Sequence, residues 1–123
     1  MALGHMNAEE SLRELEASLA RPSATPCTWR ADRDAYLAEM AANLRSHLIS
    51  PMKVKAVASE WAQRYADQSS EVREMMALVR SEDTWLLYDP KQKVFAKAFG
   101  NNLEAPLSLL GFSSDDALTE WLG

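Results

Sequence analysis

Apolar positions in the first two thirds of the chain recur every three or four residues, which is the spacing of one face of a helix. The pattern predicts helices over residues 7–20, 31–48, 51–67 and 70–80. The third of these would begin at Ser50-Pro51, with Ser50 as its cap, and its apolar stripe ends with Trp61 and Tyr65.

The first helix has a narrow apolar stripe made of Leu12, Leu15 and Leu19. We interpret this stripe as a docking or dimerisation surface. Residues 21–28 then interrupt the pattern with two prolines among small and polar residues, which predicts a linker. The helix over 7–20 would be an arm joined to a single globular domain over 29–123. A helix that folds back onto its own core is the alternative, and the sequence leaves it open.

After Ser81 the spacing of apolar residues changes from that of a helix to that of a strand. Residues 84–88 are aromatic and apolar, residues 89–92 have turn chemistry and residues 94–99 alternate, which predicts an antiparallel hairpin over 84–99. Residues 106–110 fit either a helical turn or a third strand that begins at Leu107. The polar run 113–116 is typical of a capped helix start.

The expected fold class is therefore α+β and mostly helical, with four to five helices and one β-hairpin. A hairpin with two open edges is a reason for self-association. Together with the leucine stripe, these edges predict a homodimer.

Composition and charge exclude several classes of protein. Of the 123 residues, 47% are apolar and 25% are charged, which is ordinary for a folded domain. The apolar runs are far shorter than the roughly 20 residues that cross a bilayer. Residues 1–6 are typical of a cloning remnant, and no secretory signal follows them. Cys27 is the single cysteine, which excludes an intrachain disulfide and favours the cytoplasm.

The net charge is −5 and no segment forms a basic stripe, which argues against direct binding of nucleic acid. A helix-turn-helix unit over residues 31–80 is a competing interpretation. Its recognition helix would mix acidic with basic side chains and would lack a run of residues suited to base edges.

Candidate catalytic residues are few. Cys27 and His47 are 20 positions apart, and nothing in the sequence brings them together. Acidic pairs lie at apparent helix starts and turns, where capping explains them. No phosphate-binding loop and no hydrolase or metalloprotease motif is present. We therefore expect a protein that is not an enzyme and that needs neither a metal nor a cofactor.

The supply of aromatic and methionine side chains is the feature that stands out. The chain has four tryptophans and six methionines, and these residue types are enriched at protein interfaces. Filling the core is the alternative use for any one of them. The residues that we expect on a partner-binding surface are Trp29, Tyr36, Met40, Met75, Met76 and Trp85.

Two resemblances bear on function. Residues 85–90, 94–99 and 118–122 resemble the tail of small bacterial toxin-immunity proteins, in which a strand–turn–strand precedes a last helix ending in an apolar pair. In size, acidity and layout, residues 7–123 are similar to the QslA-type quorum-sensing anti-activators of pseudomonads. That resemblance implies a protein that binds a LuxR-type transcription factor and blocks its dimerisation and DNA binding. Neutralisation of a toxin is the alternative function.

Overall fold

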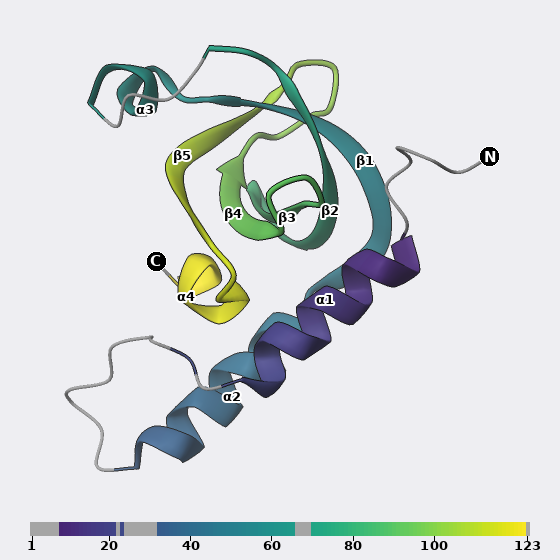
Figure 1. Cartoon of the computed structure of the whole chain (residues 1–123), viewed down its shortest axis with the longest axis vertical. Helices are drawn as coiled ribbons and strands as arrows, with labels where there is room; N and C mark the ends of the chain where they lie inside the picture. The colour runs from purple at the N-terminus through teal and green to yellow at the C-terminus, as the bar shows by residue number, and fades with distance from the viewer. Residues whose placement is uncertain (1–7, 22, 24–31, 66–69, 123) are drawn as a thin grey trace.

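The computed structural model describes residues 8–21, 23, 32–65 and 70–122 (Figure 1). The elements are, in chain order, α1 (Ala8–Ala20), α2 (Arg33–Ser46), β1 (Leu48–Ala58), α3 (Glu60–Tyr65), β2 (Arg73–Ser81), β3 (Thr84–Asp89), β4 (Val94–Phe99), β5 (Leu107–Ser114) and α4 (Ala117–Leu122). The strands close into a barrel in the order β1-β2-β3-β4-β5. Figure 1 shows α1, α2 and α4 gathered at one side of this barrel and α3 at the far end.

Strands that follow one another in the chain pair antiparallel, and β1 closes the barrel by pairing parallel with β5. This parallel seam is short, since it joins Ala56, Val57 and Ala58 to residues 107–109. The loop 103–106 lies close to residues 53–55 in the middle of β1, and α3 contacts β5. The predicted hairpin over 84–99 has no open edge in the closed barrel, because β3 is hydrogen-bonded to β2 and β4 is hydrogen-bonded to β5.

The strands separate two cores. The inner core fills the barrel and consists of Val54, Ala56, Met75, Ala77, Trp85, Leu87, Ala96, Ala98, Leu107 and Leu109. The outer core lies between the barrel and the helices and consists of Leu15, Leu44, Met76, Leu78, Val79, Leu86, Tyr88, Phe95, Ala117, Leu118 and Trp121. Successive strand residues point to opposite faces, so β2 and β3 supply both cores in alternation. The alanines of the inner core leave room for the Trp85 ring, whose Nε1–H donates to the Gly100 carbonyl at 2.9 Å.

The prediction of a mostly helical fold is wrong. The chain is α+β, but residues 70–80 form β2 after an irregular start, and residues 51–67 contain most of β1 followed by the short α3. The helix-turn-helix interpretation fails for the same reason. Residues 75–79 are all buried, so every position in this run is apolar. A short run of this kind shows neither the two-residue repeat of a half-buried strand nor the 3.6-residue repeat of a helix, and its sequence cannot tell the two apart. Met, Ala and Leu favour helices, and pairing with both neighbouring strands overrides that preference.

Pro51 lies within β1 rather than at a helix start. The register of β1 against β2 shifts between Leu48 and Met52, and an irregularity of this kind is where a strand accepts proline. The residues that follow alternate, because Val54 and Ala56 are buried while Lys53 and Lys55 are exposed.

Several local predictions are confirmed. The hairpin pairs Thr84 with Phe99 and Asp89 with Val94, and its turn is held by the Asp89 Oδ1, which accepts from the Lys91 N–H at 2.9 Å. Helix α2 lies inside the predicted range 31–48. For residues 106–110 the sequence left a helical turn and a strand open, and the structure has the strand, since β5 begins at Leu107. Asp116 accepts from the Thr119 N–H at 3.1 Å at the start of α4, as the capped start predicted.

Helix α1 packs onto the barrel. Leu15 is fully buried in the outer core, and Leu12 and Leu19 pack against it. The Ser18 hydroxyl accepts from the Ala117 N–H at 2.9 Å and donates to the Asp115 carbonyl at 2.7 Å, so that it caps α4 from the other end of the chain. The leucine stripe therefore covers this chain's own core, which was the alternative that the sequence left open. Homodimer formation stays a prediction that neither the stripe nor the hairpin edges now support.

Replacing Leu15 with alanine is expected to lower the free energy of unfolding by about 2–5 kcal/mol, because it leaves a cavity in the outer core. Urea denaturation followed by circular dichroism measures the change. The control is Glu16→Ala on the solvent side of α1, where an exposed ion pair with Arg45 at 2.9 Å contributes less than about 1 kcal/mol. Equal, small effects of the two substitutions would mean that α1 is a detached arm.

Candidate functional site

Three of the residues expected on a partner-binding surface lie in the core instead. Met75 and Trp85 are buried inside the barrel, and Met76 is buried in the outer core. On a strand, neighbouring side chains point to opposite faces, and here both faces are covered. A partner could reach Met75 and Trp85 only if the barrel opened, and Met76 only if the covering helices moved away. The interpretation of these residues as surface anchors is therefore corrected.

The remaining expected residues lie on α2 or outside the described part of the chain. Tyr36 and Met40 are half-buried on α2, and Met40 packs against the outer core. Trp29 and Cys27, with most of the predicted linker over 21–28 and the whole of 1–6, lie outside the described residues. They therefore carry no part of the site described below.

His47 lies at the end of α2. Its Nδ1 is 2.9 Å from the Asn43 carbonyl and 3.1 Å from the Ser46 hydroxyl, and its ring is 6.4 Å from that of Trp121. These contacts attach the ring to the last turn of its own helix. Among the described residues, no group of three or more His, Cys, Asp or Glu side chains is placed to hold a metal ion. The helices in the described ranges are all too short or too polar to span a membrane.

An exposed group of aromatic rings is shared between α3 and β5. It consists of Trp61 and Tyr65 of α3 and Phe112 of β5, and we call it the aromatic surface. The three residues are 50%, 67% and 62% exposed. The ring centroids of Trp61 and Tyr65 are 5.8 Å apart, and those of Trp61 and Phe112 are 5.9 Å apart, both with tilted planes. Rings in this arrangement attract one another, so the group is a joint surface rather than three separate side chains.

The local structure of α3 turns these rings outward. The Ser59 hydroxyl accepts from the Ala62 N–H at 3.1 Å and caps the helix, and the Gln63 side chain donates to the Ala58 carbonyl at 2.7 Å. Ala62 is fully buried. Trp61 and Tyr65 are four positions apart and therefore lie on one helix face. The helix packs through its smallest side chain and exposes its largest ones, which is the reverse of ordinary amphipathic packing.

A hollow of about 280 Å³ adjoins the aromatic surface, and the two share Phe112. Its other lining residues are Lys97 of β4, Leu110 of β5, and Thr119 and Glu120 of α4. The Glu120 Oε2 accepts from the Ser114 hydroxyl at 2.8 Å. Partial burial raises the pKa of Glu120 and lowers the pKa of Lys97, because it disfavours the charged form of each. The hollow thus combines an apolar wall with two ionisable groups that are partly buried.

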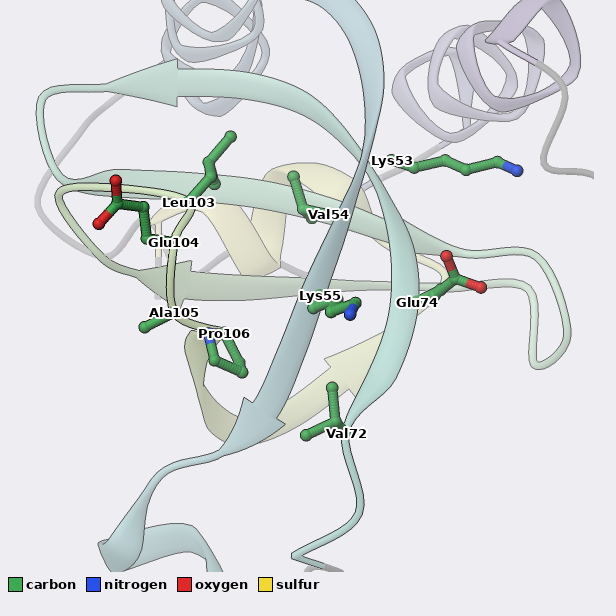
Figure 2. Close-up of a pocket in the computed structure, with 9 residues that line it drawn as sticks. All are labelled: Lys53, Val54, Lys55, Val72, Glu74, Leu103, Glu104, Ala105 and Pro106. Carbon is green, nitrogen blue, oxygen red and sulfur yellow. The ribbon is translucent and has the colours of Figure 1, made fainter.

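A second, wider groove of about 530 Å³ runs along β1. Figure 2 shows the loop residues 103–106 on one side of β1, and Val72 and Glu74 on the other. Lys55 and Glu74 are register partners across β1 and β2. Lys53 and Glu104 also line the groove, so the charges of its described residues balance, and none of these residues is aromatic. The shape of this groove suits an extended segment of a partner. Its balanced charges would discriminate less between partners than the aromatic surface does.

The sequence contains a signal for the part of the aromatic surface on α3, but the helical spacing of its rings points to the core instead. The spacing of Trp61 and Tyr65 matched the core stripe of a long helix, so both rings were expected inside. The useful signal was the polar surroundings of the rings, since residues 59–65 contain a single small apolar residue, Ala62, between them. Phe112 lies beyond the parallel seam, and only the fold brings it to α3.

Neither a protein-family model, nor a curated protein, nor a solved structure matches this chain. The inference of function therefore begins from the aromatic surface and the hollow beside it.

The carboxyl of Glu120 is expected to make folding less favourable as the pH rises. Its pKa is higher in the folded state than in the unfolded chain, so the folded state binds the extra proton and the associated stability is lost as the pH rises through the folded pKa. Glu120→Gln removes this titration. Urea denaturation should show the variant gaining stability over the natural protein between pH 4 and pH 7.

The exposed Glu104 provides the control for this measurement, and Glu104→Gln should show a smaller change over the same pH range. A Glu120→Gln variant that loses stability relative to the natural protein as the pH rises would contradict the assignment.

Proposed function

We propose that this protein is a non-enzymatic binding protein that inhibits a partner protein by covering part of the partner's surface. The observation that carries the proposal is the aromatic surface of Trp61, Tyr65 and Phe112. Contiguous exposed apolar patches on small proteins commonly mark interaction sites, and aromatic residues are enriched at the centre of interfaces. Trp61 and Tyr65 project from a helix that is capped by Ser59, which limits the conformational freedom they lose on binding and so favours affinity.

The specific form of this proposal that the sequence favours is an anti-activator of a LuxR-type transcription factor in the cytoplasm. In this mechanism the protein covers the dimerisation surface of the activator, which then cannot bind DNA. An interface of standard size, at least about 1,200 Å² in total, would extend from the aromatic surface over the hollow at α4. The net charge of −5 supports a protein partner over direct contact with nucleic acid.

One observation favours the second candidate, an immunity protein that neutralises a bacterial toxin. A groove of about 430 Å³ next to the hollow is lined by the carboxylates of Asp115, Asp116 and Glu120, with Arg21 at its edge. An acidic surface suits a basic partner, and toxins that attack nucleic acid carry basic surfaces for their substrate. The partner's identity separates the two candidates.

Substitution of the aromatic surface is expected to abolish capture of the partner. The natural protein and the double variant Trp61→Ala, Phe112→Ser are immobilised, and native cytoplasmic extract is passed over both. Mass spectrometry should find one protein that is retained at least tenfold more strongly by the natural chain, because central aromatic anchors each contribute about 2 kcal/mol or more. A transcription factor supports the anti-activator, and a toxin domain supports the immunity protein.

The matched control is Leu103→Ser, which removes an exposed apolar side chain from the groove along β1 (Figure 2). This variant should retain the partner. Equal retention by the natural chain and the double variant, with the circular dichroism spectra unchanged, would refute the aromatic surface as the interface. Loss of the partner from the Leu103→Ser variant alone would assign binding to the groove along β1.

A further inference from the structure

We infer that the surface beside the aromatic rings is built for a basic segment of a partner protein, in which an apolar side chain enters the hollow at Phe112 and a neighbouring lysine or arginine lies against Glu120 and Asp115. This inference rests on the proposed function and names the chemistry of the partner.

The first support is continuity. Phe112 contacts Trp61 in the aromatic surface and also lines the hollow. Thr119 and Glu120 line both the hollow and the acidic groove beyond it. One surface therefore runs from α3 across β5 to α4, with aromatic rings at one end and carboxylates at the other. An extended segment that followed this path would meet apolar contacts first and negative charge next.

The second support is the charge of the groove. Among the described residues, three carboxylates and the one guanidinium of Arg21 line it. Arg21 is 3.9 Å from the Asp115 carboxylate, and that carboxylate is 77% exposed, which leaves it accessible from solvent. The Asp116 carboxylate has an internal role, since it accepts from the Thr119 N–H and from the Ser23 hydroxyl. Asp115 and Glu120 are therefore the groups that a cation would meet.

The third support is the state of Glu120. The Ser114 hydroxyl is the hydrogen-bond donor placed at its carboxylate, at 2.8 Å, and partial burial disfavours its charge. A cation brought by a partner would offset that cost, so the complex would gain more from this carboxylate than from a fully solvated one. Lys97 lines the same hollow and would attract an acidic side chain of a partner instead. The test below therefore compares a basic with an acidic peptide directly.

The test is a nuclear magnetic resonance titration of the full, ¹⁵N-labelled chain with two capped tetrapeptides of matched length. The basic probe is acetyl-Phe-Arg-Leu-Arg-amide, and the acidic probe is acetyl-Phe-Glu-Leu-Glu-amide. We expect amide shifts at residues 61–65, 110–112 and 119–120. The Kd for the basic probe should be at least about fivefold lower, which is the effect of one favourable ion pair at a partly buried site.

The double variant Asp115→Asn, Glu120→Gln keeps the shape of the surface and removes the two charges. In this variant the two probes should bind within about twofold of each other. Stronger binding of the acidic probe, an unchanged ratio in the double variant, or the absence of shifts at the named residues would each overturn the inference.

These outcomes are separable from failure of the proposed function. Loss of the natural partner from the Trp61→Ala, Phe112→Ser variant, combined with equal binding of the two peptides, would uphold the interface and reject its preference for a basic segment. Retention of the partner by that variant would reject the proposed function whatever the peptides show.

Discussion

Burial of β2 and β3 on both faces is the constraint on which the rest of the structure depends. Met75 and Ala77 point into the barrel while Met76 and Leu78 point out of it, so an apolar outer face must be covered as well as an inner one. Helices α1, α2 and α4 supply that cover, and the hydroxyl of Ser18 on α1 caps α4. That side of the molecule is consequently occupied by its own chain. Among the described residues, these three helices do not extend over α3 (Figure 1). The rings of Trp61 and Tyr65 on α3 and of Phe112 on β5 are exposed.

The parts of the fold that could be predicted from the sequence are those with local signals. Residues 94–99 alternate, Asp89 closes a turn through its own side chain and Asp116 caps the last helix, so each of these elements is specified by residues within a few positions. The barrel has no comparable signal. Its closing pairs join residues 56–58 to residues 107–109, which are about fifty positions away, and the run 75–79 is apolar at every position because two cores meet there.

The candidate site shows the same division. The sequence indicated that aromatic side chains would matter, but it could not say which rings would be covered, because coverage depends on the whole barrel. Trp85 fills the inner core and gives its Nε1–H to the Gly100 carbonyl, whereas Trp61 is half exposed on a helix of six residues. The difference between these two tryptophans lies in their neighbours. Only a structure that places Ala62 against the barrel shows that Trp61 must face away from it.

The combination of rings and carboxylates on one surface has a physical consequence for recognition. Aromatic rings supply affinity with little selectivity, since any apolar side chain of suitable size can pack against them. Charges contribute less affinity but discriminate between partners, because a like charge placed against the partly buried Glu120 would be repelled and left unpaired. With the rings at α3 and the carboxylates at α4, an extended partner segment has one favourable direction across β5. On the proposed interface, one strand and two short helices would select the orientation of the partner segment as well as its composition.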